Sequence, residues 1–204
     1  MGNEMIVLKY LLIALGSYLF GSISFSVLLS RKMPKGDVRK QGSGNAGATN
    51  MARVYGLGAG FKVLVGDMIK AGIPMLCGKL LAGEWGLAIA GLAAMIGHCF
   101  PVFHDFKGGK GVSVGGITSF FVDWRVGAMV VGGFLIGAFG TKKVSFGSVV
   151  GAVMITVGAV IFHVSTPRLI LSAVDMCILI WRHKENIKRL INGTEADFKP
   201  NRNK

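Results

Sequence analysis

Charged residues are scarce in this chain, and acidic ones are the scarcest. Only 16% of the 204 residues are charged, with 10 Asp or Glu against 23 Lys or Arg. A soluble domain has about a quarter of its residues charged. The chain is instead 51% hydrophobic, with a mean hydropathy of +0.56. This composition excludes an ordinary soluble domain and indicates a membrane protein.

Cysteine and proline are also rare. Three Cys without metal-type spacing give neither a disulfide framework nor a metal site. Five Pro and the lack of a G-X-Y period exclude collagen and Pro-rich disorder, although Gly is abundant at 31 residues. Glycine at this level is typical of closely packed membrane helices and of phosphate-binding loops.

Apolar segments alternate with polar loops along the whole chain. A transmembrane helix needs about 20 apolar residues. The first long segment lacks a signal-peptide cleavage site, so we expect it to be retained as a helix. We predict an all-α, polytopic membrane protein with about seven transmembrane helices, some short or broken, in a single integral membrane domain of residues 1–204. The predicted segments are 5–29, 61–81, 85–103, 112–122, 126–139, 144–164 and 167–181.

The fourth of these segments, 112–122, is too short to cross a bilayer. Its residues reach only about 16 Å at a helical rise of 1.5 Å per residue. A helix that ends inside a membrane must border protein or a polar recess, because its bare end cannot face lipid. The sequence therefore predicts a recess near residues 107–116.

Lys and Arg gather in alternate loops. Residues 31–40, 107–110 and 142–143 and the C-terminal tail carry most of them. The positive-inside rule then places the N-terminus outside and the C-terminus inside. The same rule explains the net charge of +13 without a polyanionic partner, so we expect no nucleic-acid binding.

The first polar segment, residues 42–50, reads Gly-Ser-Gly-Asn-Ala-Gly-Ala-Thr-Asn. Backbone N–H groups and small polar side chains ahead of a helix are typical of an anion site. The string matches G-x-G-x-x-G, but no strand precedes it and no acidic ribose partner follows, which excludes a Rossmann site. A simple flexible turn is the alternative. The candidate residues are Ser43, Asn45, Thr49 and Arg53.

In the second segment, Lys107 and Lys110 frame Gly108 and Gly109. Ammonium and backbone N–H groups can converge there on phosphate oxygens. The segment is no Walker A loop, because Lys110 precedes Gly rather than Ser or Thr. A basic loop that touches lipid headgroups is the alternative. Ser148, near the start of the sixth helix, could add a hydroxyl, with simple helix packing as its alternative.

The third polar segment is 183–195. On a helix His183 and Asn186 would share a face, and Glu185 could pair with Arg189. An amphipathic tail on the membrane surface is the alternative. Within the second apolar segment Asp67 and Lys70 also share a face, and we interpret them as a structural ion pair.

These segments together resemble the three cytoplasmic motifs of the bacterial acyl-phosphate:glycerol-3-phosphate acyltransferases, the PlsY family. The resemblance extends over nearly the whole chain, and the motifs occur in the right order. Ser24 stands where the family often has Pro, and Val-Ser-Val at 112–114 replaces the commoner Val-Ala-Thr. Neither departure affects a charged group. The matching segments are 42–53, 97–103, 106–112 and 183–195, with Gly-Ser-Ile at 21–23 and Asp67 to Lys70.

The resemblance implies transfer of a fatty acyl group from acyl phosphate to the 1-hydroxyl of sn-glycerol 3-phosphate. The products would be lysophosphatidic acid and inorganic phosphate, in the phospholipid synthesis of a bacterial inner membrane, with the active site facing the cytoplasm. No cofactor or metal is expected. The expected partners are glycerol 3-phosphate, acyl phosphate and membrane lipid, and the acyl-phosphate-producing enzyme is a candidate.

The residues and the resemblance together give the predicted site. We predict catalytic roles for His183, Asn186, Ser43 and Arg53. We predict that the substrates bind to Asn45, Thr49, Lys107, Gly108, Gly109, Lys110 and Ser148. His183 has two possible roles, general base or hydrogen-bonding group.

The chain lacks the H-x-x-x-x-D pair of acyl-CoA-dependent acyltransferases, because Phe103 and Gly109 follow His98 and His104 at that distance. Acyl phosphate is already activated and needs less acid–base catalysis. A transporter for phosphorylated metabolites is the main rival, but no inverted repeat is visible and the motifs cluster on one side. A non-catalytic lipid-binding scaffold is the second rival.

Overall fold

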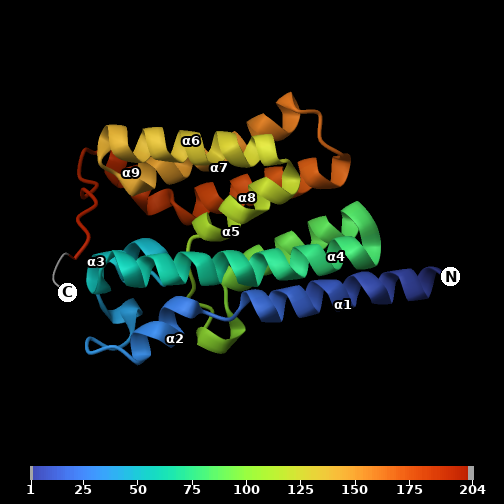
Figure 1. The fold of residues 1–204 in the computed structure, drawn as a ribbon, viewed down its shortest axis with the longest axis horizontal. Coiled ribbons are helices and arrows are strands. Elements are labelled where there is room, and N and C mark those ends of the chain that lie inside the picture. The colour runs from blue at the N-terminus through green and yellow to red at the C-terminus, as the bar shows by residue number, and fades with distance from the viewer. Residues whose placement is uncertain (1, 202–204) are drawn as a thin grey trace.

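The computed structural model describes residues 2–201, and no β-strand occurs among them. The all-α prediction is confirmed. Helices of the chain run roughly along one long axis (Figure 1). The α-helices are α1 (Asn3–Gly21), α2 (Phe25–Arg31), α3 (Ala48–Tyr55), α4 (Leu57–Cys99), α5 (Val112–Val122), α6 (Trp124–Thr141), α7 (Val144–Ile161), α8 (Thr166–Arg182) and α9 (Lys184–Ile191).

The helix α4 is a hairpin of two membrane-length arms. Its backbone leaves the helical region at Ala82 and at Gly83, where φ is +62°. The arms touch where Gly78 faces Gly86, since a Cβ on Gly86 would lie 2.0 Å from the Gly78 oxygen. Figure 1 shows the two arms side by side. They correspond to the predicted segments 61–81 and 85–103.

Four stretches in the described residues are long and apolar enough to cross a membrane: Asn3–Arg31, Leu57–His104, Trp124–Thr141 and Val144–Ile161. The second holds both arms of α4, and the shorter helices α5 and α8 add to it. Counted with α1, the two arms of α4, α6 and α7, they make up the seven predicted apolar segments, of which α5 is too short to cross by itself. The N-terminal end of α1 lies at one end of the long axis, and the C-terminal tail lies at the other (Figure 1). Which end faces the cytoplasm stays a prediction.

The first span is interrupted, whereas the sequence predicted one continuous helix over 5–29. The helix α1 ends at Gly21, and α2 begins at Phe25. At the break, Lys70 Nζ donates a 2.7 Å hydrogen bond to the Ile23 carbonyl. The Ser24 hydroxyl accepts from Val27 N and caps α2. A helix can break inside a membrane only where other groups satisfy its freed backbone, and Lys70 does so here.

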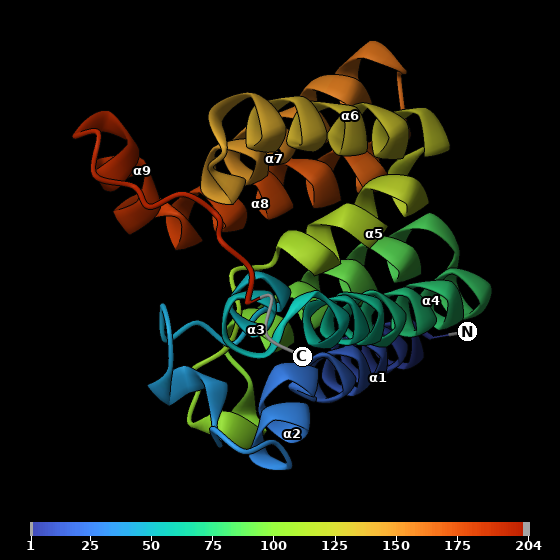
Figure 2. The ribbon, with the colours of Figure 1, turned by 60° about the vertical axis from the view of Figure 1, so that its left-hand side comes forward.

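The main core lies where α4, α5, α7 and α8 meet. The helices α6 to α8 form one layer, α1 and α4 form another, and α5 lies between them (Figures 1 and 2). Large apolar side chains on the outside, such as Leu80 and Ile136, are 78% exposed, as expected where lipid replaces water. The buried core includes Met75, Leu87, Met95, Val114, Val122, Ile155, Leu171 and Leu179.

Candidate active site

A cavity of about 2010 Å³ opens at the end of the molecule that carries α3 and α9. The residues of the three polar segments surround its mouth. Its inner part runs between α4 and the α5–α7 helices, and the predicted recess near residues 107–116 is part of it. The apolar lining includes Phe61, Leu64, Met68, Phe120, Val130, Phe134 and Ile155.

The structure brings the predicted site residues together at this cavity, with one difference. Gly109 does not line it and is buried against His98 instead. The other predicted residues line the cavity: Ser43, Asn45, Thr49, Arg53, Lys107, Gly108, Lys110, Ser148, His183 and Asn186.

The first polar segment is a loop organised by the buried side chain of Asn50. Asn50 Oδ1 accepts a 3.0 Å hydrogen bond from Ser43 N, and Nδ2 faces three loop carbonyls at 3.0–3.1 Å. Gly42 and Gly44 supply the positive φ angles of +55° and +72° that this path requires. The segment is therefore a fixed loop rather than a flexible turn. Sequence analysis missed Asn50, although it ends the motif.

Hydrogen bonds hold the second polar segment from two sides, from the end of α4 and from α8. Gly108 N and Gly109 N donate to the carbonyls of Cys99 and His98, at 3.2 and 3.1 Å. From α8, Arg182 Nη2 donates a 3.0 Å hydrogen bond to the Gly109 carbonyl. These contacts do not fit a loop that only anchors the chain in lipid headgroups.

Lys110 carries the charge of this loop into the cavity. Burial is the main cause that lowers its pKa, and the nearby Arg189 adds to the effect. Its Nζ donates a hydrogen bond to Asn186 Oδ1. Lys107, by contrast, is exposed and lies at the rim of the cavity.

His183 connects α8 to α9 and is only 3% exposed. Its Nδ1 lies 2.8 Å from the Leu179 carbonyl. A carbonyl only accepts, so Nδ1 carries the proton and Nε2 is left as an acceptor. Burial lowers the pKa of His183 to about 4, which keeps the imidazole neutral near pH 7. His183 precedes α9 rather than sharing a helical face with Asn186, yet both side chains line the cavity.

The predicted pairing of Glu185 with Arg189 is wrong. Arg189 Nε binds Glu195 Oε2 at 2.7 Å, and Glu195 Oε1 accepts a 2.7 Å hydrogen bond from Asn186. The chain turns back after α9 at Gly193, where φ is +69°. The turn brings Glu195 back to the helix, and a carboxylate bound by two donors displaces the exposed i,i+4 pair. Sequence analysis missed this role of Glu195.

Ser148 lies one turn into α7 and faces the cavity. Its hydroxyl donates a 2.9 Å hydrogen bond to the Val144 carbonyl of its own helix. In this arrangement Ser148 presents lone pairs rather than a proton to the cavity, so it could accept a hydrogen bond from a substrate hydroxyl.

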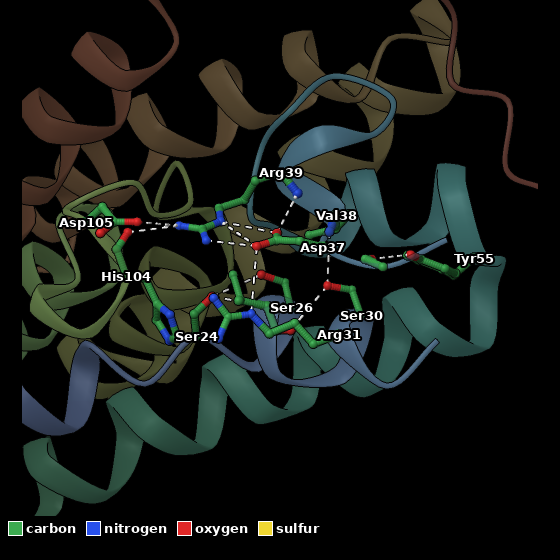
Figure 3. A network of polar contacts seen from close by, with 12 residues as sticks. Ser24, Ser26, Ser30, Arg31, Asp37, Val38, Arg39, Tyr55, His104 and Asp105 are labelled. Carbon is green, nitrogen blue, oxygen red and sulfur yellow. Dashed lines mark hydrogen bonds and ion pairs between the residues drawn. The ribbon is translucent and has the colours of Figure 1, made fainter. Parts of the chain in front are cut away.

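Arg39 lies in the 3-10 turn Val38–Lys40, just before the first polar segment, and ties this turn to the loop before the second polar segment, as Figure 3 shows. Its guanidinium binds Asp37 at 2.8 Å, and this bond is the main cause that lowers the pKa of Asp37. Arg39 Nη1 also donates to the His104 carbonyl at 3.0 Å and lies 3.7 Å from Asp105. Two segments that are far apart in the sequence are thereby held at fixed separation. Sequence analysis missed this contact.

The fold and the site define the class of protein: an all-helical integral membrane protein with cationic glycine loops at the mouth of an apolar cavity. The profile of the family described as glycerol-3-phosphate acyltransferase matches residues 11–193. The chain belongs to this family, and the expected resemblance to it is confirmed.

Similar proteins cover nearly the full length of the chain. The glycerol-3-phosphate acyltransferase of Halalkalibacterium halodurans is 38% identical over 193 residues, which are 90% of this chain and 93% of that protein. The one from Thermoanaerobacter pseudethanolicus is 41% identical over 187 residues, covering 91% and 93%.

Two solved structures have the same fold. The crystal structure of PlsY (YgiH), an integral membrane glycerol 3-phosphate acyltransferase, in its glycerol 3-phosphate form has a TM-score of 0.88 and 34% identity. The match covers 93% of this chain and 96% of that one. Its lysophosphatidic acid form has a TM-score of 0.86 and also 34% identity, covering 93% and 95%.

Proposed function

We propose that this chain is one integral membrane acyltransferase domain that transfers a fatty acyl group from acyl phosphate to the 1-hydroxyl of glycerol 3-phosphate. The products are lysophosphatidic acid and inorganic phosphate. The observation that carries the proposal is one cavity that joins cationic glycine loops to an apolar interior. Such a cavity suits a phosphate group and an acyl chain at the same time.

The acceptor fits the polar mouth. Side-chain donors of Ser43, Arg53 and Lys110 can bind its phosphate. The Gly108–Gly109 turn, whose N–H groups bond to the Cys99 and His98 carbonyls, holds Lys110 at the cavity. Belonging to a family described as glycerol-3-phosphate acyltransferase supports this acceptor. The neighbouring crystal structure in a glycerol 3-phosphate form supports it as well.

Acyl phosphate suits the site as donor because its phosphate is a good leaving group. The acceptor's hydroxyl oxygen bonds to the acyl carbonyl carbon, and the bond from that carbon to the phosphate oxygen breaks. Phosphate leaves with the electron pair, and positive charge at the mouth stabilises it as it departs. The absence of an H-x-x-x-x-D pair in the sequence supports this donor over acyl-CoA.

His183 and Asn186 orient the acceptor in this proposal. The Nε2 atom of a neutral His183 accepts the hydrogen bond of the 1-hydroxyl. A pKa of about 4 makes this imidazole a weak base, so a phosphate oxygen of a substrate takes the proton during the transfer. Catalysis then depends mainly on positioning and on charge neutralisation.

The proposed setting is the inner membrane of a bacterium, with the cavity mouth facing the cytoplasm. The crowding of Lys and Arg in loops at this end supports that orientation. Glycerol 3-phosphate would enter from the cytoplasm, while the acyl chain and the lysophosphatidic acid exchange with membrane lipid. The enzyme that produces acyl phosphate is a candidate partner.

Parallel assays of purified protein with three donors test the proposal. Glycerol 3-phosphate is supplied with acyl phosphate, acyl-CoA or acyl carrier protein, and lysophosphatidic acid is measured. Acyl phosphate alone should support turnover, and Ser43→Ala should reduce it, which excludes a contaminating enzyme. Comparable turnover with acyl-CoA would contradict the donor. Uptake of glycerol 3-phosphate into proteoliposomes without acylation would instead indicate the transporter.

A further inference from the structure

We infer that His98 is a positioning residue that fixes the loop Gly108–Lys110. The buried ion pair of Asp67 and Lys70 lies on the other side of its ring. The inference rests on the proposed function, because the loop it positions is the one that binds phosphate. His98 itself lies in the last turn of α4 and is only 5% exposed.

The imidazole of His98 lies directly against Gly109. A Cβ on Gly109 would stand 2.1 Å from Nε2 and 2.7 Å from Cε1 of that ring. The backbone holds the same contact, since Gly109 N donates to the His98 carbonyl at 3.1 Å. The imidazole ring and the backbone carbonyl of His98 therefore both fix the position of Gly109.

Behind the ring lies an ion pair inside the membrane span. Lys70 Nζ is 2.9 Å from Asp67 Oδ1, and both side chains are at most 3% exposed. The same Asp67 oxygen lies 3.7 Å from His98 Nδ1. Lys70 also donates to the Ile23 carbonyl at the break in the first span. The cluster therefore connects the first span, α4 and the glycine loop.

The bond from Lys70 to the Ile23 carbonyl supports the break in the first span, but it does not explain why Asp67 also lies beside His98. Charges in a membrane are costly, and apolar residues of similar size often replace a buried ion pair without loss of stability. A role in positioning explains the arrangement better. If the ring moves, Gly109 moves with it, and the next residue in the chain is Lys110.

Contacts on the opposite side of the loop Gly108–Lys110 show why a small displacement of the loop would affect the site. Arg182 binds the Gly109 carbonyl, and Lys110 binds Asn186. The loop is therefore held between the His98 ring and the ends of α8 and α9. Loss of the ring should loosen Lys110 and chiefly raise the KM for glycerol 3-phosphate, with a smaller effect on kcat.

A double-mutant cycle tests this contact. Gly109→Ala should raise the KM for glycerol 3-phosphate at least about tenfold, because its methyl group collides with the ring. His98→Ala alone should raise it by a smaller factor. In the His98→Ala background, Gly109→Ala should add no further increase, because the ring that it meets has gone.

Gly108→Ala is the matched control in the same loop. A Cβ on Gly108 would lie 2.0 Å from the His98 carbonyl oxygen and 2.9 Å from the Cys99 carbonyl oxygen. These are backbone atoms, so His98→Ala should not rescue Gly108→Ala. A second comparison is the double variant Asp67→Leu, Lys70→Leu. It should melt at a lower temperature in detergent, because the Ile23 carbonyl loses its donor, and below that temperature the folded variant should show the raised KM.

The inference would be overturned if Gly109→Ala raised the KM for glycerol 3-phosphate by the same factor in both backgrounds. It would also be overturned if Gly109→Ala left the KM of the parent unchanged. So would an apolar double variant at Asp67 and Lys70 with parental KM. If His98→Ala does not fold, the cycle is run with the shorter His98→Asn. Protection of each variant against heat by glycerol 3-phosphate is measured in parallel without donor. If the parent binds glycerol 3-phosphate but transfers no acyl group, the proposed function is contradicted. The cycle is then read from the protection by glycerol 3-phosphate instead of from KM.

Discussion

Lys110 donates a hydrogen bond from Nζ to Oδ1 of Asn186, across 76 residues of sequence. The amide of Asn186 in turn donates to Glu195, which pairs with Arg189. A neutral amide thus separates the ammonium of Lys110 from the carboxylate of Glu195. Lys110 is held in place while its positive charge stays available for a phosphate group.

Lys110→Met should lower kcat/KM for glycerol 3-phosphate by about 10- to 100-fold, since a hydrogen bond to a charged group contributes about 1.5–3 kcal/mol. Steady-state kinetics with both substrates varied in turn measures the effect. Lys62→Met, an exposed position on α4 outside the cavity, is the control and should keep parental kinetics. Unchanged kinetics in Lys110→Met would remove this lysine from the phosphate site.

Arg39 should act through the two segments that it joins (Figure 3). Arg39→Gln removes the fork that binds Asp37 and the His104 carbonyl. We expect a KM for glycerol 3-phosphate raised by roughly tenfold, equivalent to about 1.4 kcal/mol. Arg39→Lys should recover only part of this, because an ammonium cannot make the bidentate contact.

Asp105→Asn is the matched control for Arg39. The side chain of Asp105 is 80% exposed and lies 3.7 Å from the guanidinium. Exposed ion pairs contribute little, so its replacement should change KM less than about twofold. An equally large effect of both substitutions would mean that the exposed ion pair, rather than the backbone contact, holds the segments together.

Helix boundaries could be predicted from the sequence where polar residues or glycines stand at both ends of an apolar segment. The helix α5 begins after Gly111 and ends before Asp123, as the hydropathy pattern indicated. The break in the first span could not be predicted, because Ser22–Ser24 lie in an otherwise apolar run. The Ile23 carbonyl in this break is satisfied by Lys70, a residue 47 positions away.

The candidate site shows the same division. Spacing and residue type pointed to Ser43, Lys110 and Asn186, which the structure places around one cavity. The contacts that fix them come from residues without an obvious signal, such as Arg182 at the end of an apolar helix. Glu195 was missed as the partner of Arg189 because an i,i+4 pair is a local rule, whereas the observed pair forms through a turn.

Topology can be tested by cysteine labelling. In a background with the native cysteines replaced, we introduce Pro34→Cys and Thr194→Cys at the cavity end and Thr166→Cys at the other end, all at exposed positions. An impermeant reagent added to intact cells should label only Thr166→Cys. After the cells are opened, it should label all three. Labelling of Pro34→Cys or Thr194→Cys from outside would contradict the predicted orientation.

The buried imidazole of His183 should make stability depend on pH. Its pKa is lowered to about 4 from its usual value near 6.5, mainly by burial. The unfolded chain therefore binds the proton more readily. The contribution of the neutral His183 to the free energy of unfolding is fully present above pH 6.5 and is lost as the pH falls toward 4. The melting temperature in detergent should drop over this range by more in the parent than in His183→Gln. Parallel curves would contradict the lowered pKa.

The same substitution decides what His183 does in the reaction. Gln can still accept a hydrogen bond from the 1-hydroxyl, but it cannot take up a proton near neutral pH. If His183 only positions the acceptor, His183→Gln should keep measurable turnover, and its pH profile should match that of the parent. A fall in rate near pH 6 in both proteins would then report the phosphate of the substrate, whose second pKa is about 6.

A general base predicts a different pair of profiles. The parent would lose activity with an additional limb toward pH 4, the pKa expected for this imidazole. The folded and substrate-binding His183→Gln variant would then be inactive at every pH, because general-base catalysis contributes about 10²- to 10⁴-fold. We expect the first result. The Leu179 carbonyl fixes the ring so that Nε2 is the accepting atom, and an imidazole of such low pKa binds a hydroxyl proton only weakly.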